Sequence, residues 1–223
     1  MWACASTKGW IIGKPLPTNA PLPTDTPLPT DTPLPTDTPI PLESPTATNP
    51  PEPAWQLEYT DDFTSARSWS EDRGERFRLD FASSGYRITN DVVGDIIYST
   101  RPGTYGPVRV ETNARWLSGP LDSYFGVICH FTNGGNYYMF AAGADGWYGI
   151  LKKQMSQIIV LKEVMDTTGT LQVGQNGMTI RGDCYSGQLV LWVNGVQMLS
   201  VRDATFTGGS VGLAVGARKT GGA

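Results

Sequence analysis

From residue 55 onward, the chain alternates apolar and polar positions with a period of two. The clearest stretch is PVRVETNARWLS (107–118), where apolar or small residues at even positions alternate with Arg, Glu and Asn at odd ones. Successive side chains of a β-strand point to opposite faces, so this pattern predicts a half-buried strand. Similar short runs recur at even spacing, over 55–64, 76–81, 86–89, 95–100, 124–133, 136–144, 147–153, 157–165, 177–186, 188–203 and 209–218.

Turn residues separate these runs. Asn194-Gly195 lies between two alternating segments, which is the strongest short-range signal for a β-hairpin. Ser83-Ser84-Gly85 and Asp145-Gly146 mark further turns. A dozen or so short strands without a convincing helix predict an all-β fold, an antiparallel sandwich or a barrel.

A proline-rich segment precedes these strands. Fourteen of the 17 prolines fall within 15–53, which is built of hexads such as PLPTDT. Proline fixes φ and favours polyproline II, so these roughly 39 residues can reach on the order of 120 Å at about 3.1 Å each. The sequence therefore predicts a semi-rigid linker over 15–53 and a domain over 54–223. An O-glycosylated stalk is a sharper hypothesis, and a ligand for a proline-recognition domain ranks below it.

Residues 1–14 (MWACASTKGWIIGK) precede the linker and match no complete targeting signal. They lack the basic start and apolar run of a secretory signal, and no stretch reaches the roughly 18 apolar residues of a membrane span. Cys4 faintly matches the lipidated cysteine of a bacterial lipoprotein. We interpret 1–14 as a fragment of an N-terminal signal, anchor or other region, so membrane association would need Cys4 lipidation or a missing anchor.

Charge excludes some partners. The whole chain carries a formal net charge of −4, but five acidic residues lie in the linker region, leaving 16 acidic and 15 basic residues from Ala54 onward. This part has no basic stripe of the kind that nucleic-acid-binding surfaces require. We therefore expect neither nucleic acid nor an anionic membrane surface as a partner.

Several motifs, taken in order, resemble those of a known superfamily. They are Asp61-Asp62-Phe63 followed by Ser68-Trp69, then YFGVICHF, NYYMF with ADGWYGILK, the SGQLVLWVNG run after Cys184, and the closing TGGSVGLAVG. Their order is similar to that of concanavalin A-like lectins and glucanases, and more narrowly to bacterial extracellular domains carried behind Pro/Thr-rich linkers. The resemblance covers roughly 58–216 and implies an antiparallel jelly-roll sandwich.

The resemblance has two structural consequences. Such domains usually end in one more strand, often with an FDNF-like stretch, whereas this chain ends GARKTGGA. It therefore implies a missing final strand and an open sheet edge beside 58–63. Related domains often carry cysteines at the positions of Cys129 and Cys184, which implies a disulfide across about 55 residues, worth about 3–4 kcal/mol, and an oxidising compartment. Two buried free thiols are the alternative.

Catalytic motifs are not evident. Laminarinase-type enzymes of this fold carry Glu-x-Asp-x-x-Glu, which is absent, although a carboxylate pair could assemble from separate strands. His130 is the only histidine, alternates with Cys129 and lacks a GxSxG turn, so we interpret it as a sheet-face residue. HxxxH and CxxC metal spacings are also absent, and no Asp/Asn-rich loop supports calcium. We therefore expect no cofactor and lean against an enzyme.

The aromatic residues offer the best candidate site. With Phe125 and Cys129 pointing inward, alternation places an outward stripe of Tyr124, His130, Tyr137 and Trp192 on a concave sheet, with Trp147 capping the groove. Aromatic faces can stack on sugar rings while polar tips donate hydrogen bonds. The alternative is that these side chains pack under loops or neighbouring strands.

Three hypotheses of function remain open. The first is an extracellular or cell-surface carbohydrate-binding, lectin-like module presented on a stalk. The second is a structural or protein-interaction sandwich that uses the same face. The third is a glycoside hydrolase without the usual paired-carboxylate motif.

Overall fold

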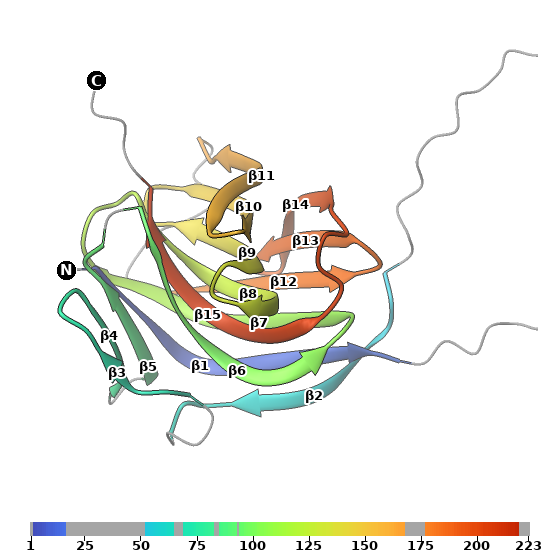
Figure 1. Cartoon of the computed structure of the whole chain (residues 1–223), viewed down its shortest axis with the longest axis horizontal. Helices are drawn as coiled ribbons and strands as arrows, with labels where there is room; N and C mark the ends of the chain where they lie inside the picture. The colour runs from blue at the N-terminus through green and yellow to red at the C-terminus, as the bar shows by residue number, and fades with distance from the viewer. Residues whose placement is uncertain are drawn as a thin grey trace, which may run out of the picture.

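The computed structural model describes residues 2–16, 52–64, 69–82, 85–92, 94–167 and 177–218, with only the backbone described for 2–9. The predicted linker lies almost wholly outside these residues. Regular structure in the described part is entirely β (Figure 1), comprising β1 (Trp2–Pro15), β2 (Trp55–Asp61), β3 (Asp72–Arg73), β4 (Phe77–Ala82), β5 (Gly85–Asn90), β6 (Ile96–Tyr105), β7 (Val108–Ser118), β8 (Ser123–Asn133), β9 (Asn136–Gly143), β10 (Trp147–Gln154), β11 (Gln157–Met165), β12 (Met178–Tyr185), β13 (Gln188–Val193), β14 (Val196–Arg202) and β15 (Gly209–Ala217).

The strands form two antiparallel sheets. One has nine strands in the order β14-β13-β12-β7-β1-β5-β4-β3, with β2 also paired to β1, and the other has six in the order β11-β10-β9-β8-β15-β6. The two sheets pack face to face, and neighbours that are distant in sequence, such as β15 and β6, lie side by side (Figure 1). The predicted all-β, antiparallel sandwich is confirmed.

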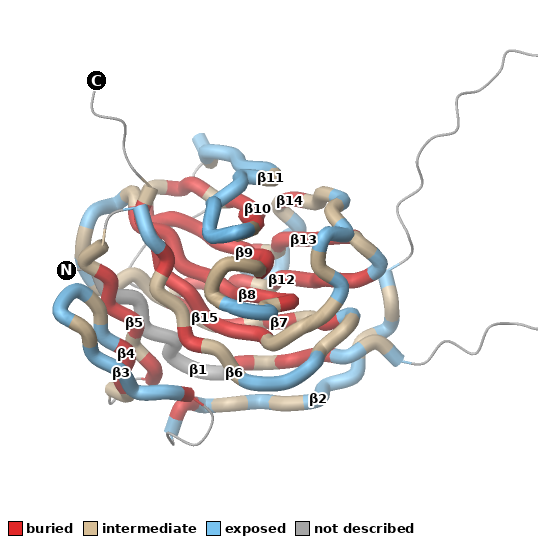
Figure 2. Tube along the Cα trace, in the orientation of Figure 1, coloured by how far each residue is buried: buried red, intermediate tan, exposed pale blue. Residues whose placement is uncertain are grey.

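The main core lies between the sheets and follows the predicted alternation. The even positions of β7 from Val108 to Ala114 are buried, and their odd neighbours are half-buried. Facing them across the core are Phe125, Val127 and Cys129 of β8. Figure 2 shows β8, β9 and β15 as largely buried, whereas β11 at the edge of the six-stranded sheet is exposed along most of its length.

The N-terminal segment belongs to the sandwich, contrary to the predicted domain start at residue 54. β1 pairs along one side with β7, and on its other side with β5 and then β2. Trp10 and Ile12 of β1 are fully buried in the main core. β1 therefore gives the strand around 58–63 a partner along one side, and within the described residues β2 pairs with no other strand, so its second side is an edge.

The sequence around β1 explains why its alternation does not predict a strand there. Trp10 and Ile12 alternate with Ile11 and Gly13, but the pattern is short and is followed at once by the proline repeats. A strand is normally expected within a few residues of the strand it pairs with. Only the three-dimensional pairing reveals that 2–15 and 55–61 are neighbours.

The predicted disulfide is confirmed. Cys129 of β8 and Cys184 of β12 are bonded across the core, with their Cα atoms 6.8 Å apart. Both cysteines are fully buried, and they join the six-stranded sheet to the nine-stranded sheet. The bridge therefore ties the two layers together.

Trp10→Ala should lower the free energy of unfolding by about 3–5 kcal/mol, as expected for removing a fully buried tryptophan. The indole packs edge-on against Trp69 with ring centroids 5.0 Å apart, so its loss leaves a cavity beside a second indole. Urea unfolding followed by tryptophan fluorescence measures this. Lys14→Ala, at an exposed position of the same strand, should change stability by less than about 0.5 kcal/mol; equal effects would contradict the burial of Trp10.

Replacing both Cys129 and Cys184 with alanine should lower the free energy of unfolding by about 3–4 kcal/mol, since the unfolded chain regains the entropy of a 55-residue loop. Urea unfolding of the oxidised protein and of the double variant gives the difference. Adding reductant to the oxidised protein should reproduce most of the loss. An unchanged midpoint in both tests would show that the bridge is dispensable.

Candidate functional site

Three of the predicted sugar-face residues share one face but are not open to solvent. Tyr124, Tyr137 and Trp147 lie on the face of the six-stranded sheet that is turned away from the core, where they form a second apolar cluster. Their exposed fractions are 3%, 1% and 3%. The expected open aromatic stripe is therefore wrong, because a ring this deeply buried cannot stack on a ligand.

Neighbouring groups on the same face account for this burial. The Tyr124 ring lies against Gly216, where a Cβ would come within 2.5 Å of the ring, and the Trp147 ring lies in the same way over Gly149. Trp147 donates its indole N–H to Glu163 Oε2 at 2.7 Å. The guanidinium of Arg218 also lies over the Trp147 ring, 5.2 Å from its centroid. The rings thus lie flat on the sheet and serve as packing.

Trp192 lies in the other sheet. It is on β13, cross-strand from Arg181 of β12, whose guanidinium stacks 4.0 Å from the centroid of the indole ring. This pair lies on the outer face of the nine-stranded sheet. The predicted grouping of Trp192 with Tyr124 and Tyr137 is therefore wrong, because alternation assigns a face within a strand but does not say which sheet contains that strand.

His130 departs from the strand pattern. Its φ is +51°, and the pairing of β8 with β9 shifts register after Cys129. This bulge reverses the alternation. The imidazole turns toward the sandwich edge, with Nδ1 2.9 Å from the Phe206 carbonyl and Nε2 2.7 Å from the Gly106 carbonyl. Phe131, which unbroken alternation from Cys129 would place toward the core, instead joins the outer aromatic cluster.

His130 belongs to a polar network that holds the segment after β14. Asp203 Oδ2 accepts from Lys152 Nζ at 2.7 Å, and its Oδ1 accepts from the Tyr138 hydroxyl at 2.5 Å. Burial acts to raise the pKa of Asp203, but the hydrogen bonds from Lys152, Thr205 and Tyr138 outweigh it and hold the pKa below its usual range. Burial and the bond to Asp203 raise the pKa of Tyr138 to about 12. We interpret His130 as a structural residue that helps to close this end of the sandwich.

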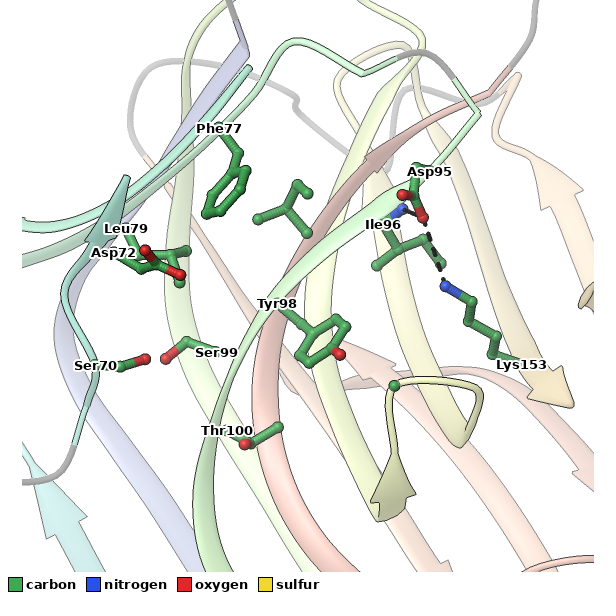
Figure 3. Close-up of a pocket in the computed structure, with 12 residues that line it drawn as sticks. Ser70, Asp72, Phe77, Leu79, Asp95, Ile96, Tyr98, Ser99, Thr100 and Lys153 are labelled. Atoms are coloured by element: carbon green, nitrogen blue, oxygen red, sulfur yellow. Dashed lines mark hydrogen bonds and ion pairs between the residues drawn. The ribbon is translucent and has the colours of Figure 1, made fainter. Parts of the chain in front are cut away.

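An open cleft of about 420 Å³ lies around the edge strand β6. Figure 3 shows β6 running through it, with Phe77, Leu79, Asp72 and Ser70 on one side and Tyr98 and Lys153 on the other. We name this the β6 cleft, lined by Ser70, Asp72, Phe77, Leu79, Asp95, Ile96, Ile97, Tyr98, Ser99, Thr100, Gly134 and Lys153. It joins the free edge of the six-stranded sheet to the β3–β4 edge of the other sheet.

Charged groups and a phenol stand at the rim of the β6 cleft. Asp95 is exposed, and its Oδ1 accepts from the Ile96 N–H at 2.8 Å and lies 3.5 Å from Lys153 Nζ (Figure 3). The Tyr98 ring is half-buried and packs against Phe131 and Tyr137 with centroids 5.1 and 5.9 Å apart. Burial, with a smaller contribution from Asp95, raises the pKa of Tyr98. The hydroxyl therefore stays protonated at neutral pH and can donate a hydrogen bond.

The β6 cleft contains none of the sugar-face residues predicted from the sequence. Alternation in DIIYST places Ile96 and Tyr98 on one face and Ile97 on the other, but it does not show that β6 is an edge strand. Phe77 and Asp72 reach the cleft only because β3 and β4 end the other sheet at the same edge. This proximity has no counterpart in the local sequence pattern.

Within the described ranges, no group of three or more His, Cys, Asp or Glu side chains is arranged to hold a metal ion. Over the same ranges, no helix has the length and apolar character needed to cross a bilayer.

The fold is that of the concanavalin A-like jelly-roll sandwiches. Among solved structures, the carbohydrate binding module CBM66 from Bacillus subtilis superposes with a TM-score of 0.56 at 11% identity, covering 68% of this chain and 92% of the module. At this identity the likeness shows the fold alone.

Two further solved structures superpose less well. A Bacillus licheniformis β-glucanase gives a TM-score of 0.46 at 10% identity, covering 70% of this chain and 82% of the enzyme. A Bacillus subtilis protein of unknown function with a galectin-like fold gives 0.48 at 11% identity, covering 67% and 83%. No protein-family model and no curated protein sequence matches the chain.

The burial of His130 predicts a loss of stability in mild acid. Burial lowers its pKa below the ordinary 6.5, and the two carbonyl contacts oppose this only in part. Between the folded pKa and 6.5 the unfolded chain binds more protons than the folded chain, so the free energy of unfolding should fall as the pH drops through this window. Urea unfolding between pH 7.5 and pH 5 measures the slope.

His130→Gln is the control, since it removes the only histidine and retains one N–H donor for a carbonyl. The difference between the two proteins in how the free energy of unfolding changes with pH gives the contribution of the histidine, separate from that of the carboxylates that titrate at lower pH. Proton NMR of the single imidazole gives the folded pKa directly. A folded pKa at or above 6.5 would contradict this prediction.

Proposed function

We propose that this domain is an extracellular or cell-surface carbohydrate-binding module, and that the β6 cleft is its ligand site. The observation that carries the proposal is the composition of this cleft, which combines half-buried aromatic rings with carboxylate, ammonium and hydroxyl groups in an open hollow of about 420 Å³. Small-molecule sites typically measure about 300–1,000 Å³ and mix apolar walls with a few convergent polar groups.

The two walls of the β6 cleft suit the two kinds of surface on a sugar. Phe77 offers apolar surface on one side of β6, and Tyr98 offers an aromatic ring on the other (Figure 3). Such surfaces pack against the C–H faces of a pyranose or furanose ring. Packing of this kind needs partly exposed rings, a condition that Phe77 and Tyr98 meet and the buried Tyr124 and Tyr137 do not.

Polar groups at the rim can recognise sugar hydroxyls. The exposed carboxylates of Asp72 and Asp95 accept hydrogen bonds, while Lys153 Nζ and the protonated Tyr98 hydroxyl donate them. Asp95 is anchored through Oδ1, and its Oδ2 makes no hydrogen bond to a described residue. Hydrogen bonds to charged groups are the stronger kind, so Asp95 and Lys153 are expected to contribute most to orientation.

The compartment is supported by separate features. The Cys129–Cys184 disulfide is typical of proteins that reside in oxidising environments. The hexad repeats with threonine beside proline are typical of stalks and spacers on outward-facing proteins. Both features agree with a binding module displayed away from a surface.

A glycan array followed by isothermal titration calorimetry tests the proposal. Tyr98→Phe removes only the hydroxyl, and Asp95→Asn keeps the acceptor for Ile96 while removing the charge. Each should weaken binding of the ligand by about tenfold or more, since a lost hydrogen bond to a charged or buried group is worth about 1.5–3 kcal/mol. Glu111→Gln, on the outer face of the other sheet, should leave the affinity unchanged.

Two results would count against this site. Glycan binding that persists in Tyr98→Phe and Asp95→Asn would move the ligand to another face. A folded protein that binds no glycan would favour the protein-interaction function instead. Circular dichroism of each variant establishes that the sandwich is intact in either case.

A further inference from the structure

The two ends of the proline-rich segment are adjacent. Pro15 at the end of β1 pairs with Trp55 at the start of β2, and the Leu16 N–H donates to the Ala54 carbonyl at 2.8 Å. Antiparallel neighbours joined in this way need a turn of only 2–5 residues. Here about 39 residues, 16–54, connect them. The connection is far longer than the pairing requires.

The composition of this connection does not favour a return to its own starting point. Proline at every second or third position predicts stiff polyproline II, with a reach on the order of 120 Å. A stiff spacer is poorly suited to closing a hairpin, because its ends must be bent back together. The same spacer can deliver β1 to a second sandwich at a distance.

β1 fits a specific position that does not depend on which chain supplies it. It lies between β7 on one side and β2 and β5 on the other, and its Trp10 packs against Trp69. Removing it would expose strand edges on both sides and uncover the Trp69 region of the core. A sandwich without its own β1 therefore presents a strand-shaped groove whose fitting occupant is another β1.

We propose that β1 is a donor strand that exchanges between copies of this chain. The β1 of one copy completes the nine-stranded sheet of another, and the proline-rich segment is the tether between the two sandwiches. The contacts are those already described for β1, so exchange costs no native pairing, as in domain-swapped assemblies. Reciprocal exchange gives a dimer, and sequential exchange gives a chain of sandwiches spaced by the tether.

Two single-cysteine variants in a Cys4→Ser background test this directly. Lys14→Cys and Gln56→Cys change exposed residues that pair across β1 and β2. The two proteins are mixed in denaturant and refolded together without reductant. They are then treated with a short cross-linker that alkylates two free thiols and leaves the Cys129–Cys184 disulfide intact. Exchange predicts a covalent heterodimer whose yield rises with protein concentration.

The matched control pairs Lys14→Cys with Gln197→Cys, an exposed position on β14 at the far end of the same sheet, and it should give only background cross-linking. The double variant Lys14→Cys/Gln56→Cys reports the competing intrachain pairing. A quantitative intrachain bond in the double variant, with no heterodimer above control at any concentration, would overturn the proposal.

Light scattering on the unmodified full chain provides an independent measurement. Exchange predicts dimers or longer species that persist on dilution, because β1 is held by pairing on both sides. Replacing 16–54 with Asn-Gly, which favours a two-residue hairpin between β1 and β2, should convert the protein to a folded monomer. A monomeric full chain at every concentration would refute exchange, whether or not the β6 cleft binds a glycan.

Discussion

The pairing of β1 with β7 on one side and with β2 and β5 on the other is the constraint on which this sandwich depends. The nine-stranded sheet is continuous only because β1 fills its middle, and the Trp10 and Trp69 indoles pack beside that strand. The Cys129–Cys184 bond then holds this sheet to the six-stranded one. The β3–β4 edge, which forms one wall of the β6 cleft, is attached through β5 to β1, whereas β6 itself is attached through β15 to the six-stranded sheet.

The six-stranded sheet shows why aromatic content alone is a poor guide to a binding face. Tyr124 and Trp147 lie flat over glycines and are covered by neighbouring side chains, so they stabilise the outer face of the sheet. Tyr98 belongs to the same aromatic cluster but lies at the edge strand, where one side of the ring meets the cleft. Whether an aromatic ring on this face packs against the sheet or can contact a ligand therefore depends on whether its strand lies inside the sheet or at its edge.

The alternation of apolar and polar residues and the turn residues predicted several features correctly. Strict alternation in 107–118 gave the buried face of β7, and the turn residues at Asn194-Gly195 gave the β13–β14 hairpin. The disulfide followed from a family resemblance and is present. Alternation failed at His130, where a bulge with positive φ turns the ring to the opposite side and carries Phe131 with it. The register shift inserts extra residues into β8 but not into β9, and no residue type in YFGVICHF marks its place.

The sequence by itself determined the all-β class, the inward residues of most strands and the composition of the linker, because these depend on the period of two and on proline chemistry within a few residues. Only the tertiary structure decided that 2–15 completes the sheet, that Trp192 lies in the sheet opposite Tyr124, and that Phe77 and Tyr98 line the same cleft. Strand order is a choice among long-range pairings, and such pairings are selected by the packing of the whole core.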